Sequence, residues 1–356
     1  MRITANKLTI ARIVLLPIPA YLIYQETSRT MVVALIIAGI LGLTDWIDGI
    51  LARREGPSVL GGLLDPIADK IFIAALYLPL TERGVIPVWM TACIFVRDFL
   101  VTSLRTSLSL RDAPMRTSLL AKFKTAIQMS GIAYVALYLA FVHDPDTWIV
   151  WFVIVLPIAF PAALIAYRLV RRQKQGVRSI AMVPLLSFAV VLRYFFGPAM
   201  SIQIILYIVT IMTVVSGFSY LLDAWSAFRR SPGSAKEILL FALDGCLVPV
   251  SFVLLLGRFE TAGMSLMIIL IVTFELSVGG LGNLLSSQKT IPGFRWSALK
   301  SVFQLLLACL ALGISWFKIA PSLPLGELAI GIAFLLTTLH TALCFWRHRA
   351  SYLSSI

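Results

Sequence analysis

The amino-acid sequence predicts an all-α protein, a polytopic bundle of about twelve transmembrane helices. Hydrophobic residues make up 59% of the 356 residues, and charged residues make up only 13%. A water-soluble domain cannot hide so large an apolar fraction. Long apolar segments also alternate with short basic connections, which is the pattern of a chain that crosses a bilayer repeatedly.

Twelve segments are apolar and long enough to cross a bilayer as helices. They run over residues 8–25, 31–51, 66–81, 86–106, 121–142, 148–167, 179–196, 199–224, 237–257, 263–284, 297–317 and 325–345. Cytoplasmic connections carry the excess of lysine and arginine in membrane proteins. With the N-terminus inside, the connections on the opposite side hold only Arg29, Arg83, Arg193, Arg258 and Lys318. Both termini are therefore predicted to be cytoplasmic.

The net charge of +13 follows from this asymmetry. Nucleic-acid binding is not expected, because no soluble face combines basic clusters with interleaved aromatic residues. Anionic lipid headgroups are the expected partners of the basic rim. The four cysteines, which lie in apolar segments without ligand spacing, are expected to be buried thiols, and no cleavable signal peptide is evident.

Four carboxylates lie close together around the second and third spans: Asp45, Asp48, Asp65 and Asp69. A carboxylate at membrane depth costs about 2.5–3.5 kcal/mol on insertion scales, so such residues tend to be paired and functional. Four of them would also repel one another. A bound cation is the simplest compensation.

The spacing of the first pair predicts a binding face. If the second span continues as a helix, Asp45, Asp48, Gly49 and Ala52 lie on one side of it. Two oxygen ligands and two positions with almost no side chain would let a bulky polar ligand approach the helix. Arg53 follows, where a guanidinium can bind phosphate through two hydrogen bonds.

The second pair predicts the start of another helix. Asp65 is a favoured N-cap residue and Pro66 a favoured first helical residue, so a helix is expected to begin here, with Asp69 one turn later on the same side. All-oxygen ligands suit Mg²⁺ or Mn²⁺. Two such ions would clamp a diphosphate, although an Asp-Gly turn or ordinary helix capping would explain either half alone.

Cationic residues follow in the fourth and fifth spans. Arg97 lies well inside an apolar segment, where an unpaired charge is costly, and Arg105 lies on nearly the same face. Lys122 begins the next span on the same membrane side. Asp98, although adjacent to Arg97, is expected to point to another side of the helix. These cations are expected to converge near the metal site, with snorkelling to lipid phosphate as the alternative.

Three strings together resemble the signature of the CDP-alcohol phosphotransferase family, whose members are integral to membranes. The first is D-x2-D-G-x2-A-R, from Asp45 to Arg53, followed by G-x3-D-x3-D ending at Asp69. The second is N-x-L-T-x-x-R at residues 6–12. The third, R-[ED]-x3-[TS]-x2-R at 97–105 followed by K-x-K-T-x2-Q at 122–128, is similar to the phosphatidylglycerophosphate synthase branch.

The resemblance implies transfer of a phosphatidyl group from CDP-diacylglycerol to sn-glycerol 3-phosphate, giving phosphatidylglycerophosphate and CMP. It implies two Mg²⁺ or Mn²⁺ ions held by Asp45, Asp48, Asp65 and Asp69. Asp69 would also act as the general base. The cytidine diphosphate would be received by Gly49, Ala52 and Arg53. The acceptor phosphate would be bound by Arg97, Arg105 and Lys122.

The resemblance also implies a homodimer. The charge pattern predicts that the carboxylate cluster lies on the cytoplasmic side of the membrane, and the cell inner membrane is the expected location. Residues 1–228 form the predicted catalytic domain, with an inserted hairpin at about 148–196. Residues 229–356 form a predicted four-helix extension that carries no recognisable motif. Two alternatives stay open: the same chemistry with another acceptor such as inositol phosphate, and a membrane transporter or non-catalytic scaffold.

Overall fold

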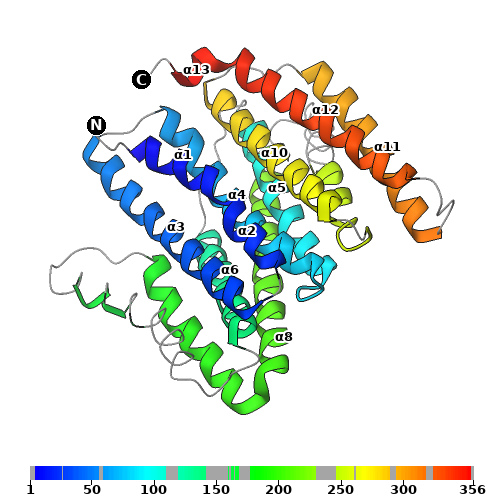
Figure 1. Ribbon diagram of the computed structural model, residues 1–356. Coiled ribbons are helices and arrows are strands. Elements are labelled where there is room, and N and C mark those ends of the chain that lie inside the picture. The colour runs from blue at the N-terminus through cyan, green and yellow to red at the C-terminus, as the bar shows by residue number, and fades with distance from the viewer. Residues whose placement is uncertain are drawn as a thin grey trace. The chain divides into compact units, whose positions relative to one another are not determined.

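Every element of the computed structural model is a helix in the part of the chain that the structure describes (Figure 1). The described residues are 5–25, 27–55, 59–109, 119–141, 159, 162–163, 165–167, 177–229, 246–259, 262–288, 294–317 and 324–353. The labelled helices are α1 (Ala5–Leu15), α2 (Pro17–Tyr24), α3 (Ser28–Glu55), α4 (Val59–Glu82), α5 (Val88–Ser109), α6 (Leu119–Phe141), α8 (Val177–Arg229), α10 (Ala262–Ser287), α11 (Phe294–Phe317), α12 (Leu325–Arg347) and α13 (Arg349–Leu353). The all-α prediction is confirmed.

Contacts divide the chain into two compact units. The first contains Met1–Pro17, Ile40–Met115 and Ser219–Ile356, and the second contains Ile18–Gly39 and Arg116–Phe218. All four predicted carboxylates and both predicted arginines of the fourth span belong to the first unit. Lys122 belongs to the second.

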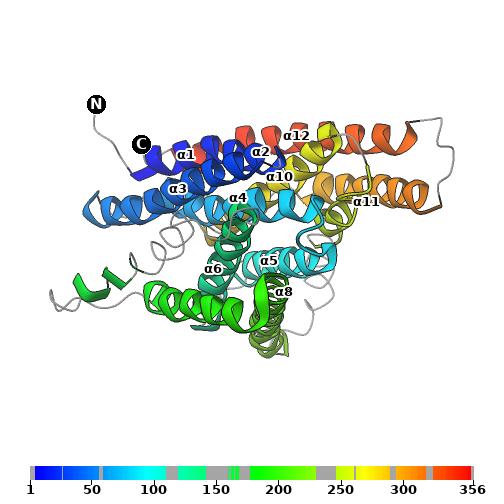
Figure 2. The same ribbon diagram turned by 60° about the horizontal axis from the view of Figure 1, so that its bottom comes forward.

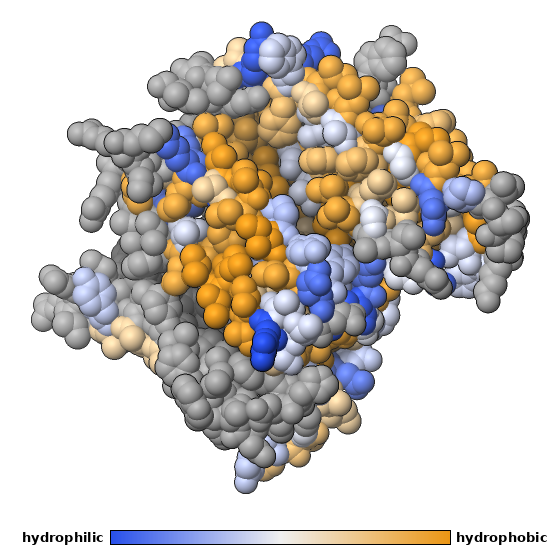
Figure 3. Space-filling view, viewed as in Figure 1, coloured by the Kyte–Doolittle hydropathy of each residue, from blue (hydrophilic) through white to orange (hydrophobic). Residues whose placement is uncertain are grey.

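Five helical segments in the described part of the chain are long and apolar enough to cross a membrane. They are Ala5–Tyr24, Ala199–Trp225, Gly263–Ser287, Leu299–Trp316 and Leu325–Arg347. Many large apolar side chains on α11 and α12 are exposed, including Leu306 and Leu335. Figure 3 shows such apolar side chains over the part of the molecule where these helices lie. Lipid is the solvent that such a surface requires, and the chain is an integral membrane protein.

Helix α4 is the centre of the first unit. It contacts α1, α5 and α10, and every residue from Ile71 to Leu80 is buried. A helix that is apolar on all sides is stable only when neighbours cover all of its sides. The charged residues of α4 lie outside this stretch, toward its two ends.

The predicted start of α4 at Asp65 is wrong, because the helix begins at Val59 and Pro66 lies inside it. A proline inside a helix removes one hydrogen bond and crowds the carbonyl four residues earlier. That residue is Gly62, where an added Cβ atom would meet nothing within 4 Å. Because α4 begins at Val59, Gly61 and Gly62 are part of the helix. Asp65 and Asp69 still lie one turn apart on the same side.

The remaining predicted spans correspond to the observed helices with one main difference. The segments predicted at 179–196 and 199–224 form a single labelled helix, α8, which is interrupted at Gly197 with φ +74°. Only glycine adopts this backbone conformation without strain. The span predicted at 148–167 lies largely outside the described residues. Of the span predicted at 237–257, residues 246–257 are described, and residues 246–253 are helical.

The C-terminal helices α10, α11 and α12 pack together. Helix α12 contacts both α10 and α11, and Figures 1 and 2 show it running alongside them. Helix α10 also contacts α4 and α5. The predicted extension therefore contacts the helices that carry Asp65, Asp69, Arg97 and Arg105.

Candidate active site

The carboxylates of the first pair lie on a continuous helix. Helix α3 extends to Glu55, so positions 45, 48, 49 and 52 share one face, as predicted. The side chain of Asp48 is buried, with 5% of its surface exposed. The predicted site residues Asp45, Gly49, Ala52 and Arg53 have described backbones, but their side chains lie outside the described set.

Thr9 of α1 connects the two carboxylate pairs. Its hydroxyl lies 3.0 Å from Asp48 Oδ2 and 3.4 Å from Asp65 Oδ1. The same hydroxyl lies 3.1 Å from the carbonyl oxygen of Ala5. A threonine hydroxyl carries one proton, so it cannot fully satisfy all three oxygens at once. The geometry therefore brings Asp48 of α3 and Asp65 of α4 together around one donor.

Arg12, one turn after Thr9, connects the same helices through charge. Its Nη2 lies 3.8 Å from Asp48 Oδ2, and its Nη1 lies 4.0 Å from Asp69 Oδ1. Only 2% of Arg12 is exposed. A buried guanidinium requires such partners, because the loss of its hydration is expensive. Arg12 by itself balances one of the three carboxylate charges.

Neither Thr9 nor Arg12 is among the residues that the sequence assigned to the site. Both belong to the string at residues 6–12, which helix capping explains equally well. The stronger signal was an arginine inside the first apolar span, where a charge needs a partner. Helix α1 also exposes Ile10 and Val14 and buries Thr9 and Arg12, which places its polar face toward the protein.

The donor chemistry of this cluster fits a hard divalent cation. Asp48, Asp65 and Asp69 offer only carboxylate oxygens, which suit Mg²⁺ or Mn²⁺. No group of three metal-ligating side chains is close enough to hold one ion among the described residues. The side chain of Asp45, the fourth predicted ligand, lies outside them. Pairs of carboxylates, rather than one tight triad, are what the described residues offer.

Arg97 makes a contact that contradicts the sequence-based expectation. Its Nη1 donates to Oδ1 of the adjacent Asp98 at 3.0 Å. The expectation that Asp98 points elsewhere is wrong, because the long arginine side chain can fold back along the helix to reach its neighbour. The guanidinium also lies 5.2 Å from the ring centroid of Tyr220, a distance typical of a cation–π contact.

Thr102, in the second turn from the end of α5, lies beside the part of α4 that carries Asp65 and Asp69. The ammonium group of Lys70 donates to the hydroxyl of Thr102, which donates in turn to the carbonyl oxygen of Asp98. Arg105 follows one turn after Thr102. Its Nε is buried and has no hydrogen-bond partner in the described residues. Lys70 was not assigned by the sequence, and the side chain of Lys122 lies outside the described set.

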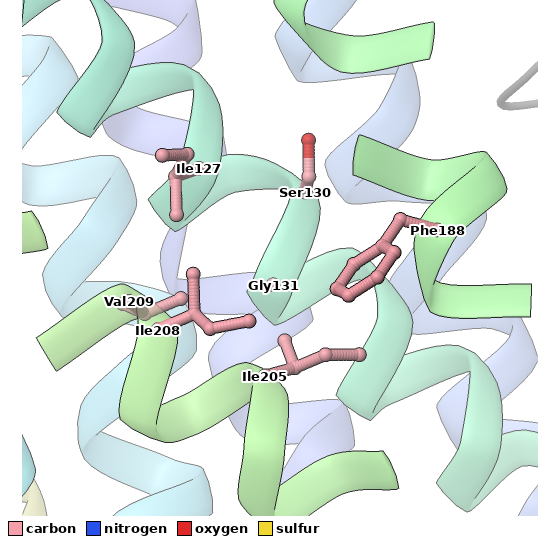
Figure 4. A pocket seen from close by; sticks show the side chains of 7 residues that line it. All are labelled: Ile127, Ser130, Gly131, Phe188, Ile205, Ile208 and Val209. Carbon is pink, nitrogen blue, oxygen red and sulfur yellow. The ribbon is translucent and has the colours of Figure 1, made fainter. Parts of the chain in front are cut away.

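A pocket in the second unit has different chemistry. Helices α6 and α8 line it with apolar side chains, and Figure 4 shows the Ser130 hydroxyl pointing away from Phe188 and Ile205. None of the described residues that line this pocket is charged, and Ser130 is the one with a polar side chain. The described lining therefore differs in chemistry from the carboxylate cluster of the first unit.

The region of the chain that matches known proteins includes this cluster. The family model for CDP-alcohol phosphatidyltransferase matches residues 2–159. The chain is 30% identical to the CDP-diacylglycerol–glycerol-3-phosphate 3-phosphatidyltransferase of Rickettsia typhi, over 44% of this chain and 93% of that protein. The enzyme of the same name from Bacillus subtilis is 32% identical, over 37% of this chain and 76% of its own length.

A relative with another name has a similar identity over a smaller share of its own length. The CMP-forming cardiolipin synthase of Homo sapiens is 33% identical, over 36% of this chain and 48% of its own length. No solved structure matches the chain at a significant level. Helices α8 and α10 to α13 lie beyond the end of the family match at residue 159.

Proposed function

The chain belongs to the CDP-alcohol phosphatidyltransferase family, and from this premise we propose that it transfers a phosphatidyl group from CDP-diacylglycerol to sn-glycerol 3-phosphate. The products are phosphatidylglycerophosphate and CMP. The observation that carries this proposal is the gathering of Asp48, Asp65 and Asp69 around Thr9 and Arg12. All five residues lie within the part of the chain that the family model matches.

The proposed cofactor is a pair of Mg²⁺ or Mn²⁺ ions held by Asp45, Asp48, Asp65 and Asp69. When bound, such ions neutralise the diphosphate and the leaving oxygen of CMP. A two-ion arrangement needs pairs of carboxylates from neighbouring helices, and α3 and α4 each supply one pair. Thr9 and Arg12 would orient these carboxylates, as outer partners of metal ligands do.

In the proposed reaction Asp69 accepts the proton of the acceptor hydroxyl. The hydroxyl oxygen forms a bond to the phosphorus that carries diacylglycerol, and the bond from that phosphorus to the CMP oxygen breaks. Gly49, Ala52 and Arg53 would receive the cytidine diphosphate. The two small residues leave room against α3, and the guanidinium offers two donors to phosphate.

Arg97, Arg105 and Lys122 are the proposed ligands of the acceptor phosphate. Support is strongest for Arg105, because its buried Nε has no hydrogen-bond partner among the described residues. Arg105→Ala is expected to raise KM for glycerol 3-phosphate by about tenfold or more, which corresponds to one lost charged hydrogen bond. KM for CDP-diacylglycerol should stay unchanged. Arg83→Ala, at the far end of α4, is the matched control.

The acceptor is tested by measuring CMP release from labelled CDP-diacylglycerol. Purified full-length protein is supplied with Mg²⁺ or Mn²⁺ and, in separate reactions, glycerol 3-phosphate, inositol phosphate or phosphatidylglycerol. We expect turnover with glycerol 3-phosphate. Turnover with inositol phosphate alone would change the proposed acceptor but keep the proposed chemistry. Turnover with phosphatidylglycerol alone would favour an activity like that of the cardiolipin synthase relative. No CMP release with any acceptor would favour the transporter or scaffold alternative.

The proposed arrangement in the membrane follows the charge pattern. The proposed twelve spans would put both termini and the active site on the cytoplasmic side of the cell inner membrane, with anionic lipids around the basic rim. Residues 1–228 would form the catalytic domain, including the hairpin at about 148–196, and residues 229–356 the extension. A homodimer completes the proposal, and nucleic acid has no part in it.

A further inference from the structure

Helix α10 belongs to the predicted extension, yet it packs against α4 and α5, two of the helices that carry the proposed site. It runs antiparallel to α4, because Ser265 donates to Glu82 near one end and Gly280 lies against Ile67 near the other. In Figure 1, α10 lies beside α4 and α5. The family model ends at residue 159, so this helix is an addition to the matched region.

Among the described glycines of α10, Gly280 makes the closest approach to a neighbouring helix. A Cβ atom at position 280 would lie 2.2 Å from Cγ1 and 2.7 Å from Cδ1 of Ile67. Real Cβ atoms do not come this close to another heavy atom, so a side chain here would force a movement. Ile67 cannot easily yield, because it is 3% exposed and its β-branched side chain is restricted at χ1. Ile67 lies midway between Asp65 and Asp69.

The following turn of α10 contacts α5 in the same region. Asn283 Oδ1 accepts a hydrogen bond of 2.6 Å from the hydroxyl of Thr106, the residue after Arg105. A Cβ atom at Gly279 would lie 3.2 Å from Cγ2 of Thr102, whose hydroxyl binds Lys70. One short stretch of α10 therefore touches the neighbours of both the proposed metal ligands and the proposed acceptor ligand.

We propose that Gly280 and Asn283 are positioning residues for the phosphatidyl transfer. Gly280 sets how closely α10 approaches the segment of α4 that carries Asp65 and Asp69. Asn283 holds the segment of α5 that carries Arg105. This inference rests on the proposed function and assigns the extension a role in it: α10 supports the site from behind.

The test compares two alanine substitutions on the same helix. Gly280→Ala introduces the clash with Ile67, whereas a Cβ at Gly263 meets nothing within 4 Å. Both changes remove one glycine from α10, Gly280 from its interior and Gly263 from its first turn. We expect Gly280→Ala to raise the Mn²⁺ concentration at half-maximal rate by about tenfold, because small displacements of catalytic groups carry large costs. Gly263→Ala should match the wild type.

A second substitution separates positioning from a general loss of folded protein. Ile67→Ala in the Gly280→Ala background removes the atoms that clash and should return the Mn²⁺ concentration at half-maximal rate toward the wild-type value. Misfolding alone would lower the maximal rate without changing the dependence on Mn²⁺ or the KM values. The increase in Tm caused by Mn²⁺ compares the Mn²⁺ binding of the same variants and does not depend on catalytic activity.

The positioning role of Asn283 is tested by measuring KM for the acceptor. Asn283→Ala should raise KM for glycerol 3-phosphate several-fold at unchanged KM for CDP-diacylglycerol, and Asn283→Asp, which keeps the oxygen acceptor, should restore it. Gln288→Ala, at the end of α10, is the control.

The outcomes distinguish this inference from the proposed function. Equal Mn²⁺ dependence and equal KM values in the Gly280→Ala, Gly263→Ala and wild-type proteins would overturn the positioning role while the function stands. A wild type that releases no CMP would overturn the function. In that case the role of Gly280 would be decided by the change in Tm that Mn²⁺ causes. An equal change in the wild type and the variants would overturn the inference, and so would the absence of any change in all of them.

Discussion

At the scale of single residues, Thr9 shows how a hydroxyl can organise carboxylates inside a membrane protein. Its one proton is shared among the oxygens of Ala5, Asp48 and Asp65. Threonines in apolar helices commonly bind the carbonyl four residues earlier and do nothing more. Thr338 of α12 makes such a bond, to Phe334 at 2.8 Å. The difference between these two threonines separates helix packing from a role in the site.

Thr9→Val is therefore an informative substitution. Valine has nearly the shape of threonine but cannot donate a hydrogen bond to Asp48 or Asp65. We expect a loss of about tenfold to a hundredfold in activity or metal affinity, the usual cost of removing an outer partner of a metal ligand. Thr338→Val is the matched control and should retain activity. Equal rates in both variants would contradict the role of Thr9.

Asp65→Asn tests the charge of a proposed metal ligand. Asparagine keeps an oxygen that can accept from Thr9, so the variant removes charge and leaves the shape nearly unchanged. Turnover should fall by at least about a hundredfold, because a bound cation contributes several kcal/mol to the transition state. The rise in Tm with Mn²⁺ should also be lost. Asp223→Asn, an exposed site on α8, is the control, and full activity of Asp65→Asn would refute the metal role.

At the scale of elements, an ion pair joins α10 to α11 within two segments apolar enough to span a membrane. Lys300 Nζ lies 2.7 Å from Glu275 Oε1, and both side chains are largely buried. Gln304 donates to Glu275 at 3.1 Å and to Thr337 of α12 at 2.5 Å. Polar side chains of this kind hold helices together in lipid, where no hydrophobic force does so.

Breaking this pair should destabilise the C-terminal helices. Lys300→Met leaves the charge of Glu275 buried, and removal of one partner of a buried pair costs about 3–5 kcal/mol. The Tm in detergent should fall. The double variant Glu275→Gln/Lys300→Met should recover most of the loss, since no charge remains buried. The control is Glu327→Gln, in the first turn of α12, which should leave Tm unchanged. An unchanged Tm in Lys300→Met would show that the ion pair is not needed for stability.

At the scale of the whole chain, α10 is long enough to run from one side of the proposed membrane to the other. Its 26 residues span about 39 Å, longer than a hydrocarbon core of about 30 Å. Near its start it contacts Glu82, and just beyond its end Gln288 donates to the carbonyl oxygen of Ser351 at 3.3 Å. If α10 crosses the bilayer, the loop at Arg83 and the C-terminal helix α13 lie on opposite sides.

Cysteine labelling tests this arrangement. In a cysteine-free background, Arg83→Cys should react with a membrane-impermeant maleimide in intact cells, because the positive-inside pattern places it outside. Ser351→Cys should react only after the membrane is opened. The reverse pattern would invert the proposed orientation. Labelling of both positions from the same side would contradict a membrane-spanning α10.

Much of the fold and part of the site could be predicted from local patterns. Apolar segments of sufficient length indicated helices, and the i, i+3 spacing of Asp45 and Asp48 indicated a shared face, which the continuous α3 provides. The start of α4 was predicted wrongly. Pro66 is favoured at a helix start, and no local signal indicated that the helix begins earlier and continues through it.

The sequence by itself determined the all-helical, membrane-embedded class and the acidic string that identifies the family, because composition, length and spacing are local properties of the chain. Only the tertiary structure decided that Thr9 and Arg12 join the carboxylates, that Arg97 pairs with Asp98, and that α10 contacts α4 through Gly280. Except for Arg97 and Asp98, these partners are far apart in the chain. Their contacts depend on which helices become neighbours, and no periodicity within a single helix encodes that choice.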